Sequence, residues 1–502
     1  MSDGIKRITI VVICILLQLA LTLLLVMWFS GYSTIFRIIL QITSIIIVLS
    51  IIKESKNLSL KLPWIIIILL APIFGTLLYI IIGQNKYQSK TLKNINKSIK
   101  DSQKYLKQDE EVIKKIKNEN LNIYGQFNYL TDFTKHPIYQ NTELEYFNLG
   151  EEAYKVILSE LKKAKKFIFL EYFIIDYGTM WTEILNILEE KVKEGLDVRI
   201  IYDDVGCIRR LRKNYNKYLE KKGIKCLCFN KLKSILSVIV NNRDHRKIMI
   251  IDGNISFTGG INIADEYINK KRKYGHWKDN AIMLKGESTW SFTLMFLQMW
   301  NAHRKDDVDF NEFRPTLKNS NNGYVCPYSE SPLDNETVGE NVCLNMINQA
   351  KKYVYITTPY LIIDNEMIKA LTLASKRGVD VKIITPGIPD KKIIYSVTRS
   401  YYKCLIKEGV KIYEYEPGFI HSKIFICDNE ISTIGTINLD YRSLYHHFEC
   451  GVYIYNSSVI KNIKQDIMST LEKSNLINKN NFKQNLLKEL FNAVLRLIAP
   501  LL

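Results

Sequence analysis

The same order of helix-like and strand-like stretches occurs twice along this chain, and no other feature limits its fold as much. In the first copy the apolar spacing predicts a helix at 151–166, a strand at 167–173, a helix at 181–194 and a strand at 198–202. In the second copy it predicts the same elements at 341–352, 353–357, 366–377 and 379–385. A repeat of about 175 residues is far longer than a solenoid period, so we predict two similar α/β domains.

Each copy ends in the same pattern of polar residues. A His is followed by Lys, Asp, a pair of small residues and Asn at matching positions. The first copy contains His245, Lys247, Asp252, Gly259, Gly260 and Asn262, and the second contains His421, Lys423, Asp428, Gly435, Thr436 and Asn438. Histidine occurs only 7 times in the chain, so a duplicated pattern of this length points to function rather than coincidence.

The spacing within the pattern indicates what each residue type does. Residues two apart on a strand face the same side, so His and Lys would present an imidazole beside an ammonium group. Asp252 and Asp428 lie on the opposite face, each before a residue typical of hairpin turns, which favours a structural over a direct role, although both belong to the motif that we predict to be catalytic. The small pairs allow close approach of a ligand, and the amides of Asn262 and Asn438 can donate to a phosphoryl oxygen.

Two further carboxylates follow the pattern, Asp279 in the first copy and Glu449 in the second. Each is a candidate to orient an imidazole by accepting its second ring N–H, although either alone is as readily a surface carboxylate. Histidines, lysines and amides suit phosphoryl chemistry without Mg²⁺, so we predict no metal and no cofactor. One imidazole would attack phosphorus and the other would protonate the leaving oxygen, with the lysines supplying positive charge.

Three apolar runs lie near the N-terminus, at 8–29, 38–52 and 62–82. The outer two are long enough to span a bilayer, whereas the middle run either spans or forms an interfacial hairpin. We therefore predict a membrane anchor with two or three hydrophobic segments at 1–83. The nine cysteines lack the spacing of a zinc site or a disulfide scaffold and read as core residues, which favours a reducing, cytoplasmic compartment for the rest of the chain.

Residues 84–133 are predicted to form a basic amphipathic linker helix. The lysines that share one helical face are Lys86, Lys90, Lys93, Lys97, Lys100, Lys104 and Lys107. Leu92, Ile95, Ile99 and Leu106 fall on another face. The lysine face is either simply solvated or lies on anionic headgroups below the anchor.

The formal net charge of +18 also raises the question of a nucleic-acid ligand. Much of the excess lies in or beside the membrane region, and the chain contains no nucleic-acid-binding motif with interleaved aromatic residues. We expect no nucleic acid as a partner, and keep a membrane-tethered nucleic-acid-binding protein or nuclease as the alternative from another class.

Together these residues resemble the phospholipase D superfamily and, within it, the bacterial cardiolipin synthases, over nearly the whole chain. The stretches that carry the resemblance are the two His-x-Lys-x4-Asp motifs, Leu170-Glu-Tyr172, Tyr202-Asp-Asp-Val-Gly206, Thr358-Pro-Tyr360, Pro417-Gly-Phe-Ile-His421, Asn438-Leu-Asp-x-Arg-Ser443, Lys61-Leu-Pro-Trp64 and Arg496-Leu-Ile-Ala-Pro-Leu-Leu502. Two positions depart from the family pattern. Lys278 stands where Arg is usual, and His447 stands where Asn commonly precedes Phe-Glu.

The resemblance implies two tandem phospholipase D-like domains, at 134–315 and 316–502, that form one active site about a pseudo-twofold axis. It implies transfer of a phosphatidyl group from one phosphatidylglycerol to another, with release of glycerol, through a phosphatidyl-histidine. Family precedent favours His245 as the nucleophile and His421 as the acid and base, and the near symmetry leaves this choice open. The partners would be phosphatidylglycerol and anionic lipid at a bacterial cell membrane, with a multi-pass anchor. A membrane-bound phospholipase D that uses water as acceptor is the nearest alternative, and the oligomeric state is unknown.

Overall fold

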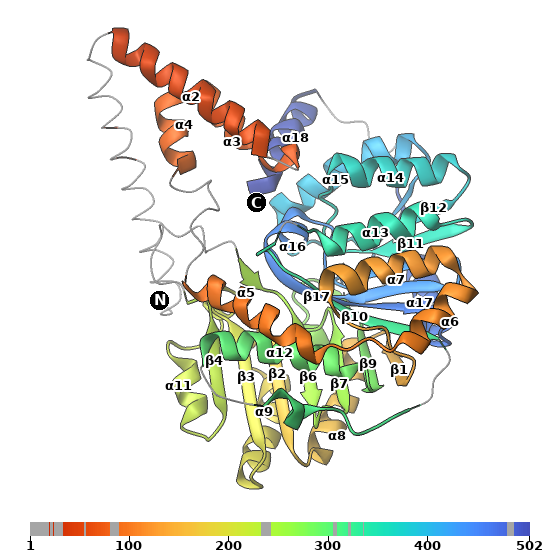
Figure 1. The fold of residues 1–502 in the computed structure, drawn as a ribbon. Coiled ribbons are helices and arrows are strands. Elements are labelled where there is room, and N and C mark those ends of the chain that lie inside the picture. The colour runs from red at the N-terminus through yellow and green to blue at the C-terminus, as the bar shows by residue number, and fades with distance from the viewer. Residues whose placement is uncertain are drawn as a thin grey trace.

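The computed structural model describes most of the chain. The described residues are 20, 24, 34–54, 57–80, 90–231, 242–304, 309–319, 323–334, 336–478 and 486–501. Two mixed β-sheets with flanking helices make up the body of the molecule (Figure 1).

The first sheet has seven strands in the order β1-β9-β7-β6-β2-β3-β4. Its strands are β1 (Thr142–Phe147), β2 (Phe167–Tyr172), β3 (Asp197–Asp203), β4 (Lys225–Phe229), β6 (Lys247–Ile251), β7 (Ile255–Gly259) and β9 (Ala281–Gly286). The accompanying helices are α8 (Gly150–Lys163), α9 (Thr179–Lys193), α10 (Asp204–Cys207), α11 (Tyr215–Glu220) and α12 (Thr289–His303). Strands β2 and β3 are buried along almost their whole length, as their unbroken apolar runs predict.

The second sheet repeats this order as β10-β17-β16-β15-β11-β12-β13 and adds β18 at its edge. Its strands are β10 (Tyr324–Glu330), β11 (Tyr353–Thr357), β12 (Asp380–Pro386), β13 (Lys411–Tyr415), β15 (Ile424–Cys427), β16 (Ile431–Gly435), β17 (His447–Tyr455) and β18 (Ser474–Leu476). The accompanying helices are α13 (Val338–Gln349), α14 (Asn365–Lys376), α15 (Lys392–Lys407), α16 (Tyr441–Tyr445), α17 (Val459–Glu472) and α18 (Leu486–Ile498). The predicted duplication of an α/β unit is confirmed.

The two halves are joined through their backbones and their cores. The short strand β5 (Arg243–Asp244) of the first half pairs with β17, and β8 (His276–Lys278) pairs with β14 (Gly418–Ile420) of the second. One cluster of buried apolar residues includes Phe169 and Ile250 from the first half and Ile426 and Val452 from the second. The sheets therefore share a core, and residues from both halves meet where β5, β8, β14 and β17 come together.

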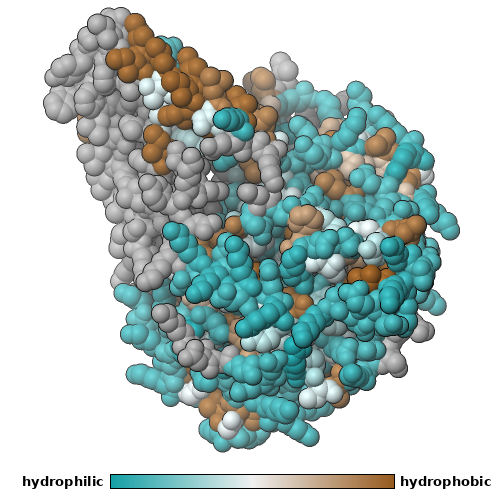
Figure 2. Space-filling view, viewed as in Figure 1, coloured by the Kyte–Doolittle hydropathy of each residue, from teal (hydrophilic) through white to brown (hydrophobic). Residues whose placement is uncertain are grey.

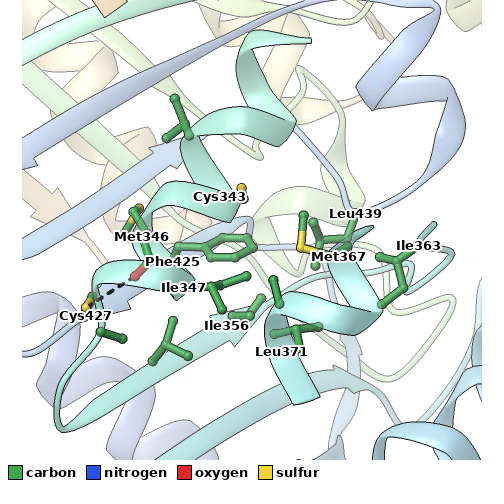
Figure 3. Close-up of a cluster of buried hydrophobic side chains, with 14 of the residues drawn as sticks. Cys343, Met346, Ile347, Ile356, Ile363, Met367, Leu371, Phe425, Cys427 and Leu439 are labelled. Carbon is green, nitrogen blue, oxygen red and sulfur yellow. Dashed lines mark hydrogen bonds between the residues drawn. The ribbon is translucent and has the colours of Figure 1, made fainter. Parts of the chain in front are cut away.

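A second cluster fills the space between the second sheet and helices α13 and α14 (Figure 3). Cys343 and Cys427 belong to this cluster, and the Cys427 thiol donates to the backbone oxygen of Met346 at 3.8 Å. The described cysteines are unpaired and, apart from the half-buried Cys404, fully buried. The prediction that they are core residues is confirmed for this part of the chain.

The expected single linker helix at 84–133 is wrong. The described part of this stretch forms α5 (Lys90–Ser102), α6 (Glu110–Glu119) and α7 (Leu121–Thr134). The side chains of Asp109 and Asn120 accept from the first backbone N–H groups of α6 and α7, so each starts a new helix. Leu92 and Ile95 of α5 pack in the same apolar core as α12, whereas α6 and α7 join the core of the second half.

The N-terminal segments α2 (Thr34–Glu54), α3 (Leu62–Leu70) and α4 (Pro72–Leu78) pack together on one side of the body, near α18 (Figure 1). The expected continuous run at 62–82 is interrupted at Ala71, because Pro72 has no backbone N–H and disfavours a helical residue before it. The run at 8–29 lies outside the described residues, apart from Ala20 and Leu24. Within the described residues, no helix combines the length and apolar character needed to cross a bilayer.

Candidate active site

Both motif histidines lie at the junction between the halves. His245 stands between β5 and β6, and its backbone N–H donates to the oxygen of Phe448 in the second half at 2.9 Å. His421 stands between β14 and β15, and its N–H donates to the oxygen of Lys278 in the first half at 2.7 Å. Each histidine is therefore held by the backbone of the opposite copy.

The two orienting carboxylates also come from the opposite copy. Nδ1 of His245 lies 2.8 Å and 3.0 Å from the two oxygens of Glu449, and Nδ1 of His421 lies 2.7 Å from Asp279. The expectation that each acid faces an imidazole is confirmed, but the pairing crosses between the copies. With Nδ1–H donating to a carboxylate, Nε2 of each ring keeps a lone pair for chemistry.

Burial sets the protonation of these four groups. It lowers the pKa of His245 to about 3 and that of His421 to about 4, against the opposing effect of the facing carboxylates. Burial alone would raise the pKa of Glu449 and Asp279, but the imidazole that each one accepts from holds its pKa below the ordinary value. The resting site thus contains neutral imidazoles beside ionised carboxylates.

The motif lysines place two cations in the same buried region. Lys247 Nζ donates to the backbone oxygen of His245 at 2.5 Å, and Lys423 donates to the oxygen of His421. Burial lowers the pKa of Lys247 to about 8 and that of Lys423 to about 7. The charge of Lys247 contributes to lowering the pKa of both Lys423 and His421, so the two copies share one electrostatic environment.

The motif aspartates lie at the far end of their strands. Asp252 accepts from the backbone N–H groups of residues 165–167, and Asp428 accepts in the same way from residues 351–353. Both adopt a left-handed backbone, with φ of 55° and 52°. These carboxylates fix the turn after β6 or β15 against the start of β2 or β11, as expected for a structural role.

The small residues and the asparagines differ between the copies. A Cβ on Gly260 would lie 1.9 Å from an oxygen of Asp279, whereas its counterpart Thr436 donates its hydroxyl to Glu449. The Asn262 amide donates to the Tyr267 hydroxyl at 2.8 Å and its oxygen accepts from a backbone N–H at 3.0 Å. Among the described residues the buried Asn438 oxygen has no hydrogen-bond partner, so Asn262 is engaged structurally and Asn438 is not engaged in the same way.

Comparison with known proteins gives the family. The model described as cardiolipin synthase, phospholipase D-like domain matches residues 157–300 and 343–471, and a phospholipase D-nuclease N-terminal model matches 39–84. A cardiolipin synthase of Alkalihalophilus pseudofirmus is 34% identical over 93% of each chain, and cardiolipin synthase 2 of Bacillus cereus is 35% identical over 89% of this chain and 88% of the relative. This chain belongs to the cardiolipin synthase family. An uncharacterized protein of Streptococcus mutans is 47% identical over 88% of this chain and 96% of the relative.

A solved structure agrees with this fold. The phosphatidylserine synthase of Haemophilus influenzae superimposes with a TM-score of 0.58 at 15% identity, covering 75% of this chain and 98% of that one. At this level of identity the match shows a common fold, and it leaves a quarter of this chain uncovered. In this member of the cardiolipin synthase family, the duplicated body and the N-terminal region match two separate family models.

Sequence reasoning noted His447 only as a departure from the family pattern and gave neither Trp277 nor His447 a contact in the site. Trp277 donates its indole N–H to Asp279 at 3.3 Å, and the corresponding position in the second copy is His447, whose ring centre lies 5.5 Å from that of His245. Within the described residues, His245, His447 and Glu449 form a buried group whose potential ligand atoms lie within 4.8 Å of one another. The expectation of no metal site did not consider this group, because His447 precedes Glu449 in sequence but faces a histidine 202 residues earlier.

Proposed function

We propose that this chain is a cardiolipin synthase that transfers a phosphatidyl group between two phosphatidylglycerol molecules and releases glycerol. The observation that carries this proposal is the crossed pair of imidazoles, each fixed by a buried carboxylate of the opposite copy. Such a pair offers a nucleophile and a proton carrier in one site, as a two-step transfer at phosphorus requires.

In the first step His245 Nε2 attacks the phosphorus of a bound phosphatidylglycerol. The new N–P bond forms as the P–O bond to glycerol breaks, and His421 gives a proton to the leaving oxygen. The imidazole of His245 becomes cationic, and the Glu449 carboxylate on its Nδ1–H stabilises that charge. The product is a phosphatidyl-histidine and free glycerol.

In the second step the terminal hydroxyl of another phosphatidylglycerol attacks the same phosphorus. His421, now neutral, takes the hydroxyl proton, and the N–P bond breaks to return His245 and give cardiolipin. Because every bond broken is replaced by a similar phosphodiester or N–P bond, the reaction is reversible. Asp279 plays for His421 the part that Glu449 plays for His245.

The lysines bind the nonbridging phosphate oxygens in this scheme. An anionic phosphodiester beside Lys247 and Lys423 favours their charged forms and raises their pKa above the values of about 8 and about 7 that burial sets. The same phosphate raises the pKa of His421, which must carry a proton when glycerol leaves. Substrate binding thereby prepares the acid as well as the nucleophile.

The chain is proposed to be attached to the bacterial cell membrane through residues 1–83, by several segments, with the domains at 134–315 and 316–502 on the cytoplasmic side. Figure 2 shows apolar side chains gathered over α2. Its exposed apolar residues include Ile38, Ile39, Ile42, Ile45, Ile46, Leu49 and Ile52. Such a surface is too large and continuous for contact with water and favours lipid.

The C-terminal helix α18 supports the same attachment. It packs on α3 and α15, burying Leu495, while its outer face exposes four apolar side chains. These are Leu487, Leu490, Phe491 and Val494. Spacing of three and four residues puts them on one face, typical of a helix that rests in a bilayer interface.

Product analysis tests the proposed reaction. Purified full-length protein in phosphatidylglycerol vesicles should form cardiolipin and glycerol in equal amounts. Phosphatidic acid without cardiolipin would instead identify a phospholipase D. For the membrane contact, a polarity-sensitive dye on Phe491→Cys should shift to the blue with vesicles, whereas the same dye on Leu373→Cys, an exposed position of α14, should not.

A further inference from the structure

His447 has no assigned task in the transfer reaction, yet it is buried beside the nucleophile. Its side chain is 8% exposed, and both ring nitrogens are buried without a hydrogen-bond partner among the described residues. The Nδ1 atom of His447 lies 3.7 Å from a carboxylate oxygen of Glu449. A buried imidazole with unpartnered nitrogens is costly, and a ligand bound by one of them would remove part of that cost.

We propose that His245, His447 and Glu449 form a binding site for a transition-metal ion, zinc in the first instance, and that its occupancy inhibits the enzyme. Each residue offers one ligand atom, and these atoms lie within 4.8 Å of one another. Two imidazoles and one carboxylate are the donor set of many three-ligand zinc sites, which leave a fourth position for water. Mg²⁺ and Ca²⁺ prefer oxygen ligands and are excluded by the two imidazoles.

Inhibition is expected because the ion would bind the Nδ1 atom of His245 and the carboxylate of Glu449. The ion replaces the proton between His245 Nδ1 and Glu449, where the distances are now 2.8 Å and 3.0 Å, and that proton leaves to solvent. His245 then shares its electron density with a cation and loses the carboxylate that stabilises its positive form.

Among the described residues, the site exists beside His245 and not beside the second motif histidine, His421. The position that corresponds to His447 beside the other histidine is Trp277, whose indole N–H donates to Asp279 at 3.3 Å. An indole nitrogen has no lone pair for a metal. One ion per chain is therefore expected, and the pair of His421 and Asp279 should not take a second.

Cobalt(II) serves as the probe, because its visible absorption reports coordination by imidazole and carboxylate without any assay of lipid turnover. Full-length protein in detergent should bind one Co²⁺ per chain, displaced by Zn²⁺. His447→Asn should weaken Co²⁺ binding by more than the 10- to 100-fold that loss of an outer partner costs. His446→Asn, at the neighbouring histidine outside the group, should bind as the wild type does.

The wild-type titration decides the matter even if a variant fails to fold, and His447→Gln provides a second variant. Lack of Co²⁺ uptake by the wild type, or unchanged uptake by a folded His447 variant, overturns the site. If cardiolipin is formed, Zn²⁺ should stop its formation in the wild type, and a chelator should restore it; a Zn²⁺-loaded protein that remains active overturns the inhibitory role. Failure of the proposed synthase activity would leave the Co²⁺ result unaffected, so the two conclusions are tested separately.

Discussion

The two histidine sites of this protein are alike in their reactive groups and different in what surrounds them. Both have a lysine two residues after the histidine and a buried carboxylate from the opposite copy. Beside His245 the neighbouring residues are His447 and Thr436, whereas beside His421 they are Trp277 and Gly260. Duplication kept the chemistry, and the surroundings provide the asymmetry that distinct roles for the two imidazoles require.

The two copies also differ in the residue that stands between the histidine and the lysine of each motif. Between His245 and Lys247, Arg246 points away from the site and forms ion pairs with Glu171 at 2.5 Å and Asp244 at 3.1 Å. At the corresponding place in the second copy, the Ser422 hydroxyl donates to the Thr357 hydroxyl at 2.9 Å. Burial raises the pKa of Glu171, and the Arg246 guanidinium acts against that shift. A buried charge network thus supports one histidine, and a neutral hydrogen bond supports the other.

The largest effect is expected from replacing each of the two motif histidines in turn. His245→Asn should lower cardiolipin formation by more than about 10⁴-fold because the nucleophile is lost, and His421→Asn by about 10²- to 10⁴-fold. With a nitrophenyl phosphatidyl ester, whose leaving group needs no proton, His421→Asn should accumulate a phosphatidyl adduct. Peptide mass spectrometry should locate it on His245, and an adduct on His421 in the His245 variant would reverse the assignment.

The two carboxylates that pair with a histidine of the opposite copy should likewise affect different steps of the reaction. Glu449→Gln should slow adduct formation from the nitrophenyl ester by about 10²- to 10⁴-fold, because His245 loses the partner of its Nδ1–H. Asp279→Asn should leave that step largely intact and slow transfer of the adduct to phosphatidylglycerol. Rapid-quench measurement of both steps distinguishes them. Slow adduct formation in the Asp279 variant alone would mean that each acid serves its own copy.

The contacts of Arg246 and of Ser422 should contribute differently to the free energy of unfolding. Arg246→Met leaves Glu171 and Asp244 buried without their counter-charge and should lower the free energy of unfolding by about 3–5 kcal/mol. Ser422→Ala removes one neutral hydrogen bond and should cost about 1 kcal/mol. Circular dichroism during thermal unfolding in detergent compares the two variants. Equal losses would show that the buried charges contribute no more than the hydroxyl pair.

The pH dependence of the lysines tests whether the two copies share one electrostatic environment. Both must be charged to bind phosphate, and their pKa values are lowered to about 8 and about 7, so the affinity for phosphatidylglycerol vesicles should be retained below pH 7, fall by about tenfold per unit between pH 7 and 8, and fall more steeply above that. Lys423→Gln leaves only Lys247, and Lys247→Gln removes the charge that lowers the pKa of Lys423. The basic limb of the profile should therefore move to higher pH in both variants. A limb that stays in place would assign it to another group.

Much of this comparison was accessible from the sequence, because the repeat and the two motifs are local patterns. The strand that begins at Lys247, the strand that follows Lys423, and the structural place of Asp252 and Asp428 follow from alternation and turn chemistry. The crossing of Asp279 and Glu449 does not, because it depends on how two separately formed sheets pack. The importance of His447 was hidden for the same reason, since nothing near it in sequence indicates that its neighbour is His245.

The predictions for 84–133 and 62–82 were wrong for a different reason. The residues that end or begin a helix there are visible in the sequence, but longer patterns of lysine spacing and apolar residues were given more weight. Regular lysine spacing suggested one helix over 84–133, while Asp109 and Asn120, both good helix N-caps, mark where new helices begin. In the same way Pro72 divides the apolar run at 62–82. A local cap or proline should therefore take precedence over a long periodic pattern.

The smallest effect on activity, and one that should be equal in both copies, is expected at the motif aspartates. Asp252→Asn and Asp428→Asn keep one acceptor oxygen and tolerate a positive φ, so each should cost only about 1–2 kcal/mol of stability through lost charge-assisted hydrogen bonds. Asp252→Ala should cost more, because it leaves three backbone N–H groups without their acceptor. Since neither carboxylate contacts a motif imidazole, kcat of the two Asn variants should stay near that of the wild type, measured beside His421→Asn. A loss of kcat comparable to that of the histidine variant would give the aspartates a direct part in the reaction.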